Sequence, residues 1–199
     1  MRKSIALTIA AAFMSAGVAI AADQGAAARR LLIYSPESGN KTIVYKSKNT
    51  TATMAGDPVT NGASFNLAIG GDGTQCMSLP SSGWTAISTI GFRYRDPLLA
   101  NGPVKVALIK RNASLGIFRL KLIAKRSAIT VVPGNPTTSY GTNFKINAGG
   151  DSYCASNGSA IPAQDTATSF QVYNDDGDAC SVAACSSPSG AFLEAAVAF

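Results

Sequence analysis

Residues 91–124 read GFRYRDPLLANGPVKVALIKRNASLGIFRLKLIA. Three runs within this stretch alternate apolar and polar side chains, and Pro, Gly, Asn and Asp separate the runs. Successive side chains of a β-strand point to opposite faces, whereas a helix repeats its apolar positions every three or four residues. The stretch therefore predicts three strands, over 91–95, 104–110 and 117–124, each with one buried and one exposed face.

The rest of the chain continues this pattern. Further candidate strands, bounded by turn residues and filled with β-branched and aromatic side chains, lie at 31–34, 42–46, 64–69, 75–79, 85–88, 128–132, 143–148, 152–155 and 169–173. A spacing of about 8–12 residues without a helical period between strands predicts an all-β sandwich or barrel. We favour a single two-sheet β-sandwich, Ig-like or jelly-roll-like, and only residues 191–199 could form a short helix.

The apolar positions of these strands predict the core. It would contain Ile33, Ile43, Phe65, Leu67, Phe92, Tyr94, Val104, Val106, Leu108, Phe118, Leu120, Leu122 and Phe170. The lone tryptophan, Trp84, also fits a core position better than an exposed sugar-stacking one. The segments 65–72 and 144–151 each predict a strand followed by a Gly-Gly-Asp turn, which indicates two similar hairpins or an ancient duplication.

The first residues have the pattern of a secretory signal. Arg2 and Lys3 precede an apolar, Ala-rich run, and Ala19-Ile20-Ala21 is an A-x-A cleavage site. We expect a signal peptide over 1–21, a flexible leader over 22–30, a β-sandwich over 31–185 and a C-terminal tail over 186–199. No later run is long and apolar enough to predict a transmembrane helix in the mature chain. The expected location is periplasmic or extracellular.

The four cysteines fit this exported location. Cys76, Cys154, Cys180 and Cys185 are an even number, which in an oxidising compartment predicts two disulfides. A zinc site would need close cysteine pairs at both ends, and only 180 and 185 are close. We prefer Cys154 bonded to one of Cys180 and Cys185, and Cys76 to the other. A local Cys180–Cys185 loop with two free thiols is the alternative.

The 199 residues include no histidine, which excludes histidine-dependent catalytic triads, His-ligated metals and a histidine pH switch. The sequence also contains no P-loop and no dinucleotide-binding fingerprint. Residues 174–178, NDDGD, resemble half of a calcium loop, but the glycine is one place early and Cys185 occupies the position of the usual glutamate. We therefore expect an acidic turn there, and neither a metal nor a cofactor.

Charge is the strongest functional signal. Nine basic residues and one acid lie between positions 93 and 126, whereas six acids and no basic residue follow Lys145. If the three strands of residues 91–124 are neighbours, alternation gives them a basic stripe on one face, made of Arg93, Arg95, Lys105, Arg119 and Lys121. Such a stripe would favour anionic polysaccharides or envelope polymers. A plain solvated sheet face is the alternative interpretation.

These features favour an exported, non-enzymatic binding or structural module that contacts anionic polymers, and an exported chain would not meet intracellular nucleic acid. Two alternatives remain open. One is an envelope hydrolase that uses Asp72 and Asp151 as a carboxylate pair. The other is a self-assembling surface subunit, in which the basic middle of one copy meets the acidic tail of the next.

Several short motifs follow one another in a characteristic order. They are Gly56-Asp57-Pro58, Asn61-Gly62-Ala63-Ser64-Phe65, Leu79-Pro80-Ser81-Ser82-Gly83-Trp84, Phe92-Arg93-Tyr94-Arg95-Asp96, Gly102-Pro103-Val104-Lys105 and Tyr153-Cys154. Over residues 31–185 the chain resembles a diffuse group of exported β-rich bacterial proteins with no assigned function. The resemblance implies an all-β fold, and it transfers no catalytic residues because the group has none assigned.

Overall fold

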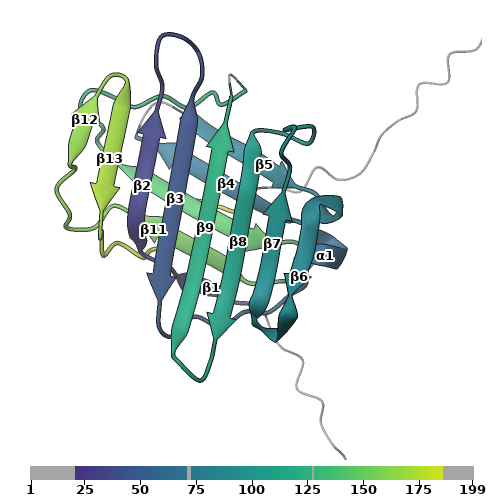
Figure 1. The fold of residues 1–199 in the computed structure, drawn as a ribbon. Coiled ribbons are helices and arrows are strands. Elements are labelled where there is room, and N and C mark those ends of the chain that lie inside the picture. The colour runs from purple at the N-terminus through teal and green to yellow at the C-terminus, as the bar shows by residue number, and fades with distance from the viewer. Residues whose placement is uncertain (1–20, 71–72, 127, 186–199) are drawn as a thin grey trace, which may run out of the picture.

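The computed structural model describes residues 21–70, 73–126 and 128–185. It confirms the all-β class, because a five-stranded and an eight-stranded sheet form two layers (Figure 1). The strands of the rear sheet run across those of the front sheet in this view. The expected signal residues 1–20, the tail 186–199 with its candidate helix, and Asp72 lie outside the described residues.

The eight-stranded sheet, called the large sheet below, is antiparallel throughout. Its strand order is β12 (Gln164–Thr166), β13 (Ser169–Tyr173), β2 (Ala28–Tyr34), β3 (Thr42–Asn49), β9 (Ile117–Lys125), β8 (Val104–Asn112), β7 (Gly91–Arg95) and β6 (Trp84–Ile87). The strands of residues 91–124 are therefore three consecutive strands of this sheet, as the alternation required.

The five-stranded sheet, called the small sheet, has the order β1 (Asp23–Gly25), β11 (Ser152–Ser156), β10 (Tyr140–Ile146), β4 (Ala63–Ile69) and β5 (Gly73–Leu79). Only β1 joins in parallel. The two similar hairpins are β4–β5 and β10–β11, and they lie side by side with Phe65 opposite Phe144. A short helix, α1 (Pro58–Asn61), precedes β4, and two 3₁₀ turns (Ser81–Gly83 and Ser88–Ile90) flank β6.

Aromatic side chains fill the space between the sheets. Phe118 of the large sheet stacks on Tyr153 of the small sheet with ring centroids 4.7 Å apart. Trp84 is 3% exposed, and its indole N–H donates to the carbonyl of Leu79 at 3.2 Å, which confirms its core position. Phe144 lies under both Trp84 and Tyr153. The Phe118–Tyr153 and Trp84–Phe144 contacts cross the layers and pack the two sheets together, whereas Phe144 and Tyr153 are neighbours within the small sheet.

Two predicted segments differ from the structure. The flexible leader over 22–30 is wrong, because β1 and the start of β2 lie within it and Ala26 and Ala28 are fully buried. Small alanines let this backbone approach the small sheet closely, a signal that composition alone did not reveal. The segment 128–132 is not a strand. It lies beside β5, where the Gln75 side chain bonds the backbone of Ala128 and Thr130 in place of a backbone ladder.

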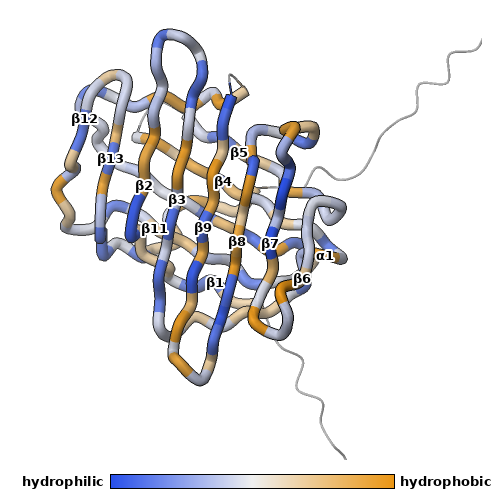
Figure 2. The backbone as a smooth tube through the Cα atoms, in the orientation of Figure 1, coloured by the Kyte–Doolittle hydropathy of each residue, from blue (hydrophilic) through white to orange (hydrophobic). Residues whose placement is uncertain are grey.

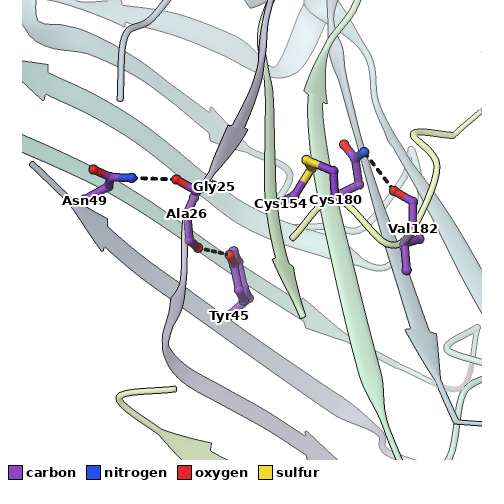
Figure 3. Close-up of a disulfide and its surroundings, with 8 residues drawn as sticks. Gly25, Ala26, Tyr45, Asn49, Cys154, Cys180 and Val182 are labelled. Carbon is purple, nitrogen blue, oxygen red and sulfur yellow. Dashed lines mark hydrogen bonds between the residues drawn. A yellow bond between two sulfur atoms is a disulfide. The ribbon is translucent and has the colours of Figure 1, made fainter. Parts of the chain in front are cut away.

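The C-terminal strap (residues 178–185) crosses the outer face of the small sheet. It follows one row of paired residues, Gly25, Cys154, Asn143, Asn66 and Cys76. Disulfides tie Cys154 to Cys180 and Cys76 to Cys185, as preferred from the sequence. Between them, the Asn143 and Asn66 amides donate to the Val182 and Ala183 carbonyls at 3.0 and 2.9 Å. Figure 3 shows the first disulfide beside the Val182 hydrogen bond.

Burial of Tyr45 gives the fold a dependence on alkaline pH. Tyr45 is fully buried and its hydroxyl donates to the Ala26 carbonyl at 2.8 Å (Figure 3). Loss of solvation raises the pKa of Tyr45 to about 12. An unfolded tyrosine loses its proton near pH 10, so this contribution to stability is complete below about pH 10 and is lost as pH rises towards 12.

We therefore expect the free energy of unfolding in urea to fall between pH 10 and 12, by about 1.4 kcal/mol for each unit of pKa difference. Phenylalanine cannot ionise, so Tyr45→Phe should remove the part of this pH dependence that Tyr45 contributes. An unchanged slope in Tyr45→Phe would contradict the assignment.

Candidate anion-binding face

The basic stripe expected from the sequence is formed on the outer face of the large sheet. Strands β7, β8 and β9 are neighbours, and their buried residues alternate with polar ones along each strand. Arg93, Arg95, Lys105 and Arg119 are exposed and Lys121 is half-buried. Figure 2 shows the resulting alternation of hydrophilic and hydrophobic segments along these strands. All five predicted residues therefore share one face.

One part of the expected alternation is wrong. Val106 and Leu108 were placed in the core, but both are half-buried and pair with the outward residues Ile123 and Lys121. The cause is a β-bulge between Val104 and Val106, which shifts the register of β8 against β9. A bulge inserts one extra residue and so exchanges the faces of all residues beyond it. Lys105 is the extra residue and stays exposed. Phe92, also placed in the core, is half-buried and packs against it.

Register places the outward cations in rows that cross the strands. One row joins Arg30 to Lys46, Lys46 to Lys121, and Lys121 through Leu108 to Arg93. Adjacent strands lie about 4.8 Å apart, so this row extends roughly 19 Å from β2 to β7. A second, shorter row joins Lys48 to Arg119 and Arg119 to Lys110. We call the whole set the basic face: Arg30, Lys46, Lys48, Arg93, Arg95, Lys105, Lys110, Arg119, Lys121 and Lys125.

The strands of this face carry no acidic side chains, although Asp175 and Asp176 share a hollow with Lys48 at its edge. The seven strands from β13 to β6 contain no Asp or Glu. Among the described residues, Arg30 donates to the amide oxygen of Gln171 at 3.3 Å, and Arg111 and Arg126 donate to backbone carbonyls. The Arg30 guanidinium also lies 5.5 Å from the Tyr173 ring centroid. These contacts orient cations without neutralising them, so their field adds over the face.

Asp96, the acid that follows β7, is turned inward. Asp96 follows Arg95 and is 5% exposed. Burial by itself raises its pKa, but hydrogen bonds from the Asn101 and Ala100 backbone N–H groups outweigh this and lower the pKa below its usual value. Asp96 therefore closes the β7–β8 turn as a carboxylate, and its oxygens are occupied by the turn.

Between the cations runs a row of apolar side chains. Leu32, Val44, Ile123 and Val106 are paired across four strands and are half-buried. At its end, a shallow hollow of about 240 Å³ is lined by Arg95, Pro97, Lys105 and Val106. A surface with cations on both sides of an apolar strip can contact charged groups and apolar ring faces of one ligand at the same time.

Half of the basic face was not foreseen from the sequence. Arg30, Lys46 and Lys48 come from β2 and β3, and Lys110 and Lys125 extend β8 and β9. Their outward direction follows from alternation, as in Tyr45-Lys46-Ser47-Lys48. Their place beside Arg119 and Lys121 depends on the pairing of β3 with β9, which joins segments about seventy residues apart. No local pattern indicates that pairing.

The other sites considered from the sequence have structural roles in the described residues. Asp151 is 1% exposed and accepts hydrogen bonds from Ala22, Thr53 and Ala55, and its expected partner Asp72 is outside the described residues. Asp176 accepts from the backbone and hydroxyl of Ser159, which lower its pKa. No group of three His, Cys, Asp or Glu side chains in the described part is placed to hold a metal ion.

The acids that the structure describes after Lys145 are partly engaged inside the fold. Asp151 and Asp175 are buried, and Asp165 accepts from the Thr137 backbone. The Asp175 carboxylate also accepts from the Tyr140 hydroxyl at 2.8 Å, and burial followed by this bond raises the pKa of Tyr140. Asp176 and Asp178 are exposed, so part of the acidic charge that head-to-tail assembly would use is open to a partner.

No family model, curated protein or solved structure matches this chain. The fold and the site therefore define its class: a two-sheet β-sandwich with two disulfides and one basic sheet face. Two disulfides are typical of proteins that fold outside the reducing cytosol. Within the described ranges, no helix has the length and apolar character needed to cross a membrane.

Proposed function

We propose that the protein is an exported, non-enzymatic binding module whose basic face contacts an acidic polysaccharide of the envelope or the extracellular space. The observation that carries the proposal is the row of cations from Arg30 to Arg93, which crosses five strands without an intervening acid. A linear polyanion lying across the strands meets a cation on β2, β3, β9 and β7 in turn.

The apolar row supports a sugar polymer as the ligand. Sugar rings present apolar faces as well as hydroxyls. The strip from Leu32 to Val106 lies beside the row from Arg30 to Arg93, with Lys105 and Lys125 at its other side. Export rests on the signal pattern of residues 1–21 and on the four cysteines, all paired in the described structure. Together these support a location outside the cytosol, where acidic polysaccharides occur.

Dextran sulfate and neutral dextran provide a matched pair of probes, because they share a backbone and differ in charge. We expect the oxidised mature protein to be retained on dextran sulfate, released by moderate salt, and not retained on dextran. Replacing Lys46, Lys121 and Arg93 together by Gln should weaken binding on the order of 10- to 100-fold at low salt. The slope of log affinity against log salt should fall by roughly two to three.

The control variant removes the same charge from positions off the face. Lys41, Arg111 and Lys145 are replaced by Gln, which leaves the row intact and gives the same net charge. Arg111 is paired with the buried Phe118, and Lys145 belongs to the small sheet. We expect its binding to remain within about twofold to threefold of the wild type, since screening limits the effect of distant charges. Equal losses of affinity in the two variants would show that binding depends on net charge and not on the basic face. Failure of the dextran sulfate column to retain the wild type would refute the proposal.

A further inference from the structure

Asp151 is held at the junction of three segments. It is 1% exposed and precedes β11. One carboxylate oxygen accepts from the Ala22 backbone nitrogen at 3.0 Å, and the other accepts from the Ala55 nitrogen at 2.7 Å and the Thr53 hydroxyl at 3.1 Å. In the described part of the chain, every donor to this carboxylate is a neutral group. Buried carboxylates are ordinarily paired with a positive charge.

Ala22 is also the first residue after the expected cleavage site. Its carbonyl accepts from the Ser152 nitrogen at 3.0 Å, and the following residues form β1 in parallel with β11. Both backbone groups of Ala22 are thus bonded to residues 151 and 152. These contacts keep the Ala22 nitrogen beside Asp151 whatever precedes it in the chain.

We propose that cleavage after Ala21 turns the Ala22 nitrogen into the charged partner of Asp151, so that the mature protein gains a partly buried ion pair that its precursor lacks. Ala22 is exposed, and Asp151 is the buried member of the pair. A signal peptidase adds water across the Ala21–Ala22 peptide bond. The hydroxyl goes to the Ala21 carbonyl carbon, which leaves as a carboxylate. The freed Ala22 amine takes up a proton and is an α-ammonium near neutral pH.

The pair forms without rearrangement of the fold, because donor and acceptor are already 3.0 Å apart. A charge-assisted hydrogen bond is roughly twice as strong as a neutral one. Cleavage therefore stabilises the junction of β1, β11 and the segment around Ala55. This inference rests on the expected cleavage site and is independent of the basic face and its ligand.

The test is a cycle of four proteins. Two begin at Ala22, released from a fusion by a protease that leaves no extra residue, and carry Asp or Asn at position 151. The other two carry Gly-Ser before Ala22, which keeps an N–H donor there but moves the charge away. We expect the Gly-Ser extension to raise the equilibrium constant for unfolding in urea. The increase should be on the order of 10- to 100-fold in the proteins with Asp151 and less than about threefold in those with Asp151→Asn.

A second measurement needs only the wild type, in case Asp151→Asn fails to fold. The α-amine of Ala22 should react with an acylating reagent at neutral pH at least tenfold more slowly in the native protein than in urea. Intact mass of the exported protein should give Ala22 as the first residue. A different first residue, equal costs of the extension in both backgrounds, or equal amine reactivity in native and unfolded protein would each overturn the proposal.

Discussion

Replacing Cys76 and Cys185 together by Ala should lower the free energy of unfolding by about 4–5 kcal/mol, the largest stability effect expected in this protein. The disulfide closes a loop of 109 residues, which contains most of the sandwich. A cross-link restricts the unfolded chain more as its loop grows, so this bond stabilises more than one that closes a short loop.

The native contacts of the strap add to this effect. Cys185 is the last bonded residue of the strap, and the Asn66 bond to the Ala183 carbonyl lies just before it. Without the Cys76 bond, the end of the strap is held only by this amide. The side-chain oxygens of Asn66 and Asn143 already lack partners among the described residues, so this row depends on the two amide donors and the two disulfides.

The other disulfide is the matched control. Cys154 and Cys180 close a loop of 26 residues, and their replacement by Ala should cost about 3–4 kcal/mol. Urea unfolding of both variants under non-reducing conditions measures the difference directly. A larger loss for the Cys154 and Cys180 variant would show that local strap contacts, rather than loop length, determine what each bond contributes.

The strap shows which part of the fold could be predicted from the sequence and which part could not. Cysteine number and spacing predicted that the C-terminal segment is tied to the core by residues 76 and 154. The path of the strap was not predictable, because it follows a row set by pairing among five strands that are distant in sequence. The same is true of β1, whose short strand forms only because β11 offers an edge to it.

The basic face shows the same difference between features that depend on neighbouring residues and features that depend on strand pairing. Alternation correctly predicted that Arg93, Arg119 and Lys121 point outward, because a two-residue period depends only on neighbours in the chain. It failed for Val106 and Leu108, because the bulge at Lys105 interrupts that period and leaves no mark in the sequence. The contributions of β2 and β3 were missed because they depend on sheet order.

The corrected register makes a sharp prediction from one pair of leucines. Leu122 in β9 is fully buried and lies opposite Ala107, whereas Leu108 in β8 is half-buried and lies between Lys121 and Arg93 on the outer face. Leu122→Ala should cost about 3–5 kcal/mol, since it removes buried apolar area and leaves a cavity. Leu108→Ala should cost less than about 1.5 kcal/mol, since water can fill the space.

Both variants make the same chemical change in adjacent strands, so their difference isolates the direction of the side chain. Urea unfolding at neutral pH gives the two free energies. The uninterrupted alternation would place Leu108 in the core and make the two losses similar. Similar losses of stability would therefore contradict the bulge and the outward row through Leu108. A difference of about 2 kcal/mol or more between the two variants supports the register on which the basic face depends.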